Sequence, residues 1–173
     1  LKDREITHSN QVWSTDITYI RMKRWFIYLI AIIDWYSRRI LSWRVSNTLD
    51  VNFCTEALNE AIENYWTPEI FNTDQWSQFT SHVFTSILEK NNISISMDGQ
   101  WRYADNIFIE RLWRTIKQEE VYLREYNSPI EAMISLKKYM IFYNSQRPHQ
   151  SLGYKTPKEV YEESLRKLQN LKI

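Results

Sequence analysis

Three acidic residues occupy places where carboxylates are uncommon in folded proteins. Asp16 lies in the otherwise uncharged run 13–20, Asp74 follows a short apolar segment, and Glu110 directly follows three apolar residues. A carboxylate beside buried surface needs a partner, and each one alone is explained well by a helix cap or an ion pair. Three that converge would repel each other unless cations lie between them. We therefore expect these oxygens to bind Mg²⁺ or Mn²⁺.

Divalent cations bound by such carboxylates can catalyse phosphoryl transfer. Two such ions about 3.5–4 Å apart activate a nucleophile and stabilise the leaving oxygen of a phosphodiester. The charge pattern suits a polyanionic substrate, with a net +3 over residues 1–50, −6 over 51–100 and +4 over 101–173. An acidic pocket between basic surfaces would give this order, although charge alone favours ordinary solvated faces.

The elements that position these acids follow from hydrophobic periodicity and turn residues. Strands are expected at 12–22, 25–34, 39–46, 69–73 and 93–97. Helices are expected from Asp50 or Asn52 to about 65, at 80–91, from 105 to about 126, at 129–143 and from 157 onward, with a loop at 98–103 and irregular chain at 144–156. The order predicts an α/β protein with a five-stranded mixed sheet, three antiparallel strands then two parallel ones, flanked by helices.

The predicted organisation is a linker or tail at 1–10, a catalytic core at 11–147 and a C-terminal segment with a final helix at 148–173. The single cysteine, Cys54, excludes a disulfide scaffold and is expected to be buried. The longest apolar run, Phe26–Ile33, is too short to cross a bilayer, so we expect no membrane partner.

Five segments carry a family resemblance, together with the 35 residues that separate Asp74 from Glu110. They are WSTDITYI (13–20), YLIAIIDWYSRRILSW (28–43), EIFNTDQWSQFTS (69–81), ISMDGQWRYADNIFIERLWRTIKQEEVY (95–122) and FYNSQRPHQSLGYKTP (142–157). In this order they resemble the DDE transposase and integrase catalytic core, most closely the transposases of the insertion-sequence-three family.

The resemblance implies a ribonuclease-H-like fold with metal ligands at Asp16, Asp74 and Glu110. It implies strand cleavage by water at a transposon end, followed by attack of the freed 3′-hydroxyl on another phosphodiester. The expected partners are transposon and target DNA, further copies of this chain and an upstream helix-turn-helix region, in the bacterial cytoplasm on the nucleoid. A catalytically impaired DNA-binding remnant and a ribonuclease-H-type nuclease are the alternatives.

One face of the predicted 105–126 helix carries the candidate DNA contacts. Asn106, Glu110, Trp113, Arg114 and Lys117 share this face by helical spacing. Lys117 would lie about 10 Å along the axis from Glu110, which suits a phosphate contact, with a solvated lysine as the alternative. Arg147 and His149 could contact DNA, or Pro148 and His149 could simply fix a turn.

The composition is unusual, with 2 Gly and 8 Trp. Trp25, Trp66, Trp76 and Trp101 stand where the resembling family usually has glycine, whereas Trp13, Trp35, Trp43 and Trp113 match aromatic positions and are expected to pack the core. The four replacements lie at predicted turns, where glycine is favoured. The hypothesis is that UGA codons meaning glycine in the source have been read as tryptophan.

Overall fold

The computed structural model describes residues 5–97 and 107–170 of the 173-residue chain. Its centre is a five-stranded sheet in the order β3-β2-β1-β4-β5. The strands are β1 Val12–Arg21, β2 Phe26–Asp34, β3 Ile40–Ser46, β4 Ile70–Thr73 and β5 Ser94–Met97. β1, β2 and β3 pair antiparallel, and β4 and β5 run parallel to β1. The predicted mixed sheet is therefore confirmed.

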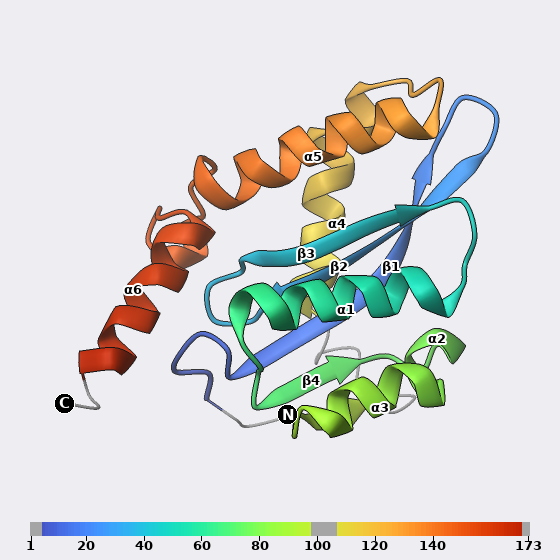
Figure 1. Ribbon diagram of the computed structural model, residues 1–173. Helices are drawn as coiled ribbons and strands as arrows, with labels where there is room; N and C mark the ends of the chain where they lie inside the picture. Colours follow the sequence, from blue (N-terminus) through green and yellow to red (C-terminus); the bar gives the residue numbers. More distant parts are fainter. Residues whose placement is uncertain (1–4, 98–106, 171–173) are drawn as a thin grey trace.

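Helices cover both faces of this sheet (Figure 1). The helices are α1 Val51–Tyr65, α2 Ser77–Thr80, α3 His82–Lys90, α4 Ile107–Glu119, α5 Pro129–Ser145 and α6 Pro157–Asn170. One hydrophobic cluster joins the sheet to α4 and α5, and a second joins the opposite face to α1 and α3. Successive strand residues point to opposite faces, so Trp13 and Ile17 of β1 belong to the α1 side. Asp16 and Ile20 consequently face the α4 side.

Local signals fix the limits of α1. The side chain of Asp50 accepts a hydrogen bond from the backbone N–H of Phe53 at 3.2 Å, so Asp50 rather than Asn52 caps this helix. The helix ends at Tyr65, and the backbone of the next residue, Trp66, lies at φ 67° and ψ −166°. This is a region that glycine alone adopts readily.

Two helix predictions are wrong in part. The helix predicted at 80–91 is α3, which begins at His82 because Ser81 is extended and its hydroxyl caps the helix, and the short α2 before it was not predicted. The helix predicted to reach about residue 126 ends at Glu119. The next residue, Glu120, is buried and accepts hydrogen bonds from Tyr126 and Ser135, which fold the following chain back over the helix end. The predicted 98–103 loop and helix start at 105 lie outside the described residues.

The segment before β1 contacts α6. Ser9 and Asn10 are both buried. The Ser9 backbone N–H donates to Ser164 Oγ at 2.9 Å, and the Asn10 amide donates to the Tyr161 hydroxyl at 2.9 Å. The division of the chain at residues 10 and 147 stays a prediction.

Cys54 is buried, as expected. Within residues 5–97 and 107–170, no helix has the combined length and apolar character that crossing a bilayer requires.

Candidate active site

Asp16 lies on the middle strand of the sheet and is held at both carboxylate oxygens. Oδ1 accepts the backbone N–H of Ile17 at 2.7 Å, and Oδ2 accepts the indole N–H of Trp113 at 2.8 Å. Burial, with a smaller contribution from the charges of Asp74 and Glu110, raises the pKa of this carboxyl from 3.8 to about 6, although these two hydrogen bonds lower it. Asp74 and Glu110 are therefore both electrostatic neighbours of Asp16.

Asp74 follows the last residue of β4 and is half-buried. β1 and β4 are parallel, with Ser14 opposite Asn72. Extending this register by two residues places Asp74 beside Asp16, at the carboxyl end of β4. Asp74 Oδ1 accepts the backbone N–H of Trp76 at 3.2 Å, while the Trp76 ring packs against the hydrophobic cluster on the α1 side.

Glu110 is exposed in the first turn of α4. The start of this helix is anchored through Phe108. The guanidinium of Arg38 lies 3.3 Å from the centre of the Phe108 ring, and Trp35 meets the same ring edge-on at 5.2 Å. Contacts on the sheet side thus fix the position of the turn that presents Glu110.

The described residues contain no ready-made cage of three or more His, Cys, Asp or Glu side chains around one metal position. Mg²⁺ does not require one, because it keeps several waters and usually binds one or two carboxylates together with substrate phosphates. Three carboxylates from β1, the end of β4 and α4, of which Asp74 and Glu110 both influence Asp16 electrostatically, supply the oxygen donors that this ion prefers. The donor set fits a divalent cation.

The predicted DNA-contacting residues fall into two groups. Arg114 is exposed and Lys117 half-buried on α4, the helix of Glu110, whereas Asn106 lies outside the described residues. Arg147 instead donates from Nε to Glu119 Oε2 at 2.8 Å, at the end of α4. His149 meets the ring of Tyr143 edge-on at 4.7 Å.

Electrostatics keep His149 neutral. Burial, together with the charge of Arg147, lowers the pKa of its imidazole to about 4. Its Nε2 is buried and has no hydrogen-bond partner among the described residues. The contacts of Arg147 and His149 are thus with the ends of α4 and α5, and their role toward DNA stays a prediction.

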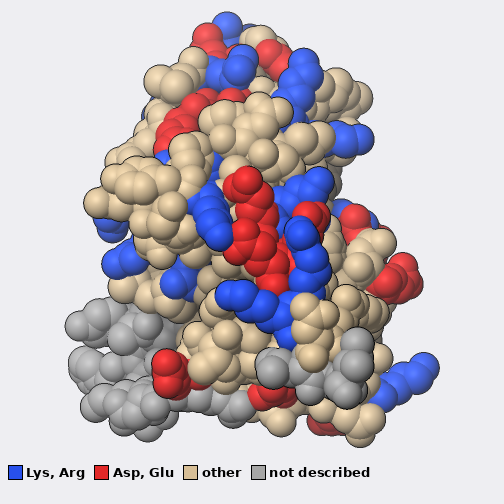
Figure 2. Space-filling view, turned by 90° about the vertical axis from the view of Figure 1, so that its left-hand side faces the viewer, with Lys and Arg blue, Asp and Glu red and all other residues tan. Residues whose placement is uncertain are grey.

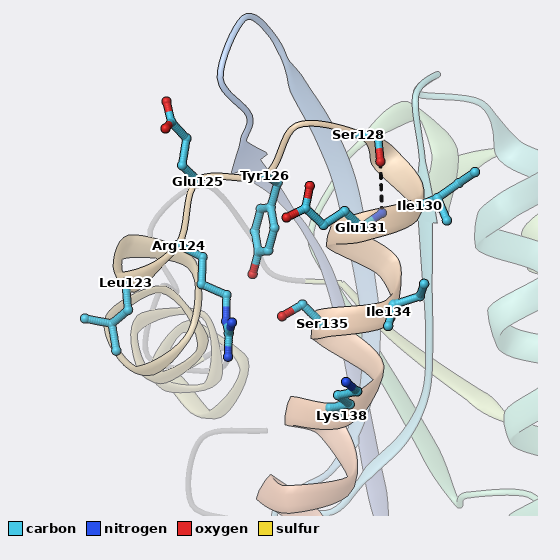
Figure 3. A pocket seen from close by; sticks show the side chains of 10 residues that line it. All are labelled: Leu123, Arg124, Glu125, Tyr126, Ser128, Ile130, Glu131, Ile134, Ser135 and Lys138. Atoms are coloured by element: carbon cyan, nitrogen blue, oxygen red, sulfur yellow. Dashed lines mark hydrogen bonds between the residues drawn. The ribbon is translucent and has the colours of Figure 1, made fainter.

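A pocket of about 610 Å³ lies away from the acids, between the segment after α4 and the first turns of α5 (Figure 3). Arg124, Tyr126 and Ser135 line it and all three bond to the buried Glu120. Ser128 caps α5 at its rim by accepting the Glu131 N–H at 3.2 Å. The contacts of Arg124, Tyr126 and Ser135 with Glu120 thus hold the chain that follows α4 against the start of α5.

The face that carries α6 mixes both signs of charge (Figure 2). Lys155 pairs with Glu163 at 2.6 Å, and Lys158 and Arg166 approach Glu162 at 3.9 and 4.0 Å. The net positive charge of residues 101–173 therefore does not make this face uniformly basic.

The fold, the three acids and the sequence together identify the protein family to which the chain belongs. The sequence matches the integrase core domain family over residues 6–102, and a second integrase core domain description over residues 91–157. The chain belongs to the integrase core domain family, and its fold is ribonuclease-H-like, as the resemblance implied.

Among sequence relatives, the chain is similar to transposases of insertion sequences. It is 33% identical over 156 residues to the transposase of insertion sequence element IS904 from Lactococcus lactis, covering 88% of this chain and 62% of the relative. It is 27% identical over 159 residues to transposase InsF for insertion sequence IS3A from Escherichia coli, covering 90% and 55%. These relatives confirm the predicted resemblance to the insertion-sequence-three family, and the chain spans little more than half of their length.

Solved structures agree on the fold. The HTLV-2 integrase catalytic core, solved with magnesium in a dimeric form, aligns with a TM-score of 0.71 at 20% identity over 89% of this chain and 97% of that one. The BIV integrase catalytic core aligns with a TM-score of 0.73 at 18% identity over 92% and 99%. Identities this low establish the shared architecture alone.

Proposed function

We propose that the chain is the catalytic domain of an insertion-sequence transposase, which cleaves DNA at transposon ends and joins the freed 3′-hydroxyl to target DNA. The observation that carries this proposal is the placement of the three acids in an integrase-type fold: Asp16 on β1, Asp74 directly after β4 and Glu110 on α4, the helix whose Trp113 bonds to Asp16. The transposase relatives support the same conclusion.

Asp16, Asp74 and Glu110 would hold Mg²⁺ or Mn²⁺, as two ions. Bound there, the ions supply charge stabilisation and nucleophile activation for phosphoryl transfer. The chain itself orients the ligands and the DNA, and no Ser, Cys or His need form a covalent bond to the substrate.

DNA contacts are proposed for Lys117 and Arg114, because α4 presents both of them beyond Glu110. Asn106, Arg147 and His149 complete the proposed set. For the cationic Lys117, Arg114 and Arg147, backbone phosphates are the expected target, since cationic side chains position a duplex without reading its sequence.

The proposed assembly contains more than one copy of the chain, an upstream helix-turn-helix region that recognises transposon ends, and DNA, on the nucleoid in the bacterial cytoplasm. A second copy is supported by α5, which exposes a row of large apolar side chains: Ile130, Met133, Ile134, Ile141 and Phe142. Monomeric surfaces rarely leave such a row uncovered.

The test uses a branched duplex that represents the joined product. Reversal of strand transfer on this substrate is a phosphoryl transfer of the same kind, so it should require the same three acids, and the substrate carries no transposon-end sequence. Mg²⁺-dependent resolution of the branch by the chain, lost in Asp74→Asn, is the expected result. Unchanged resolution by Asp74→Asn would sink the site assignment.

A further inference from the structure

We propose that Trp113 is a positioning residue of the candidate metal site: its indole N–H fixes the Asp16 carboxylate relative to the helix that carries Glu110. The inference rests on the proposed function. It assigns a polar role to a side chain that the sequence predicts to pack in the core.

The contact links two of the acid-bearing elements directly. Trp113 Nε1 donates to Asp16 Oδ2 at 2.8 Å, from α4 to the middle strand of the sheet. Trp113 lies three residues after Glu110, about 4.5 Å farther along the helix axis. One hydrogen bond therefore sets the spacing between the strand that holds the first acid and the helix turn that presents the third.

The indole is a rigid donor. Trp113 is only 6% exposed and packs among Ile109, Leu112 and Ile116 of its own helix and the apolar side chains of the sheet. A ring held in a close-packed core cannot move without disturbing its neighbours. The N–H at its edge consequently stays at one place, and Asp16 is oriented by the core itself.

This arrangement leaves Asp16 able to bind a cation. A carboxylate has about four acceptor positions on its two oxygens, and the Ile17 N–H and the Trp113 indole occupy one position on each oxygen. The indole is a neutral donor, so it orients the carboxylate without cancelling its charge, as Arg or Lys at this position would. Neutral hydrogen-bond partners behind a metal ligand are a general means of fixing its orientation.

The closing experiment measures Mg²⁺ binding to the full chain by calorimetric titration with the metal alone, beside the branch-resolution assay. Trp113→Phe removes the donor and keeps a buried aromatic ring. Trp13→Phe is the matched control, because Trp13 is also buried and its indole N–H donates to Asn10 Oδ1 at 2.9 Å on the opposite, α1 side of the sheet. A chemical denaturation curve measured in EDTA, which removes free metal, verifies that each variant is folded without Mg²⁺.

We expect Trp113→Phe to weaken Mg²⁺ binding roughly tenfold or more, the usual cost of losing a residue that orients a metal ligand. Trp13→Phe loses an indole hydrogen bond away from the acids and should bind Mg²⁺ as the unaltered chain does. The half-saturating Mg²⁺ concentration of branch resolution should rise in Trp113→Phe, with much of the rate restored at high Mg²⁺, which a merely structural defect would not show.

Equal Mg²⁺ affinity in Trp113→Phe and the unaltered chain, an equal loss in Trp13→Phe, or no Mg²⁺ binding by the unaltered chain would each overturn the inference. Should Phe at position 113 prevent folding, benzothienylalanine there replaces the N–H by sulfur and keeps the shape of the ring system. Selective loss of Mg²⁺ binding in a chain that resolves no branched DNA would uphold the role of Trp113 and overturn the proposed function.

Discussion

Asn144 and Ile40 pair as two strand residues would, although Asn144 belongs to a helix. The Ile40 backbone N–H donates to Asn144 Oδ1 at 2.9 Å, and Asn144 Nδ2 donates to the Ile40 carbonyl at 2.8 Å. β3 is an edge strand, so its outward backbone groups have no neighbouring strand to pair with. The side chain from the end of α5 satisfies both groups at the first residue of β3.

Asn144→Ala should therefore lower the free energy of unfolding by about 1–3 kcal/mol, because two backbone groups lose their partner. Chemical denaturation monitored by circular dichroism measures the change. Gln146→Ala, an exposed neighbour two residues on, serves as the control and should change stability little. Equal stability of the two variants would contradict the proposed pairing role.

Trp66→Gly should stabilise the chain by about 1 kcal/mol or more. Trp66 has φ 67° and ψ −166°, a conformation that costs a side-chain-bearing residue of order 1–3 kcal/mol. Its ring is 63% exposed, so little apolar burial is lost with it. Thermal unfolding measures the gain, and Trp25→Gly, at a position without positive φ, should show none.

The backbone conformation of Trp66 also bears on the hypothesis that UGA codons meaning glycine were read as tryptophan. A backbone that glycine adopts readily, at a residue where the resembling family has glycine, supports glycine as the natural residue at position 66. Trp76 and Trp25 have no positive φ, and Trp101 lies outside the described residues. Sequencing the coding DNA should find UGA at positions 25, 66, 76 and 101 and UGG at the other four tryptophans; UGG at all eight would end the hypothesis.

Glu119→Gln should reduce stability by about 1 kcal/mol at pH 7 and by progressively less as the pH falls. The hydrogen bond from Arg147 holds the pKa of the Glu119 carboxyl below its usual 4.5. A depressed folded-state pKa gives stability that is complete above the unfolded value and disappears as the pH falls through the folded value. Denaturation of both chains at several pH values between about 7 and 3 tests this convergence.

Glu110→Gln should slow branch resolution about a hundredfold or more. Metal ligation is worth several kcal/mol of transition-state stabilisation, and each 1.4 kcal/mol is about a tenfold change in rate. Glu89→Gln, on α3, is the control and should keep the full rate. A Glu110→Gln variant that resolves the branch at the unaltered rate would remove Glu110 from the site.

Ile134→Asp should shift the chain toward monomer in light scattering, because it places a charge in the exposed apolar row of α5. Val83→Asp tests whether any exposed apolar side chain has this effect, since Val83 is similarly exposed on α3. A monomeric unaltered chain, or equal effects of both variants, would count against α5 as the surface between copies.

Much of the fold and of the candidate site could be read from the sequence because the signals are local. Alternating or continuous apolar runs marked the strands, and Asp50 and Pro129 marked helix starts that the structure confirms. The helix ending at Glu119 could not be predicted, because buried Glu120 and its partners Tyr126 and Ser135 become neighbours only when α4 packs against α5.

The sequence by itself determined which acids to consider, through an uncharged strand run around Asp16 and the 35-residue interval from Asp74 to Glu110. Only the tertiary structure decided how they are held. Trp113 reaches Asp16 across 97 residues of sequence, and Arg147 is committed to Glu119 across 28. Hydrophobic periodicity specifies which face of an element is buried, whereas the partner of a polar atom depends on how the buried faces pack together.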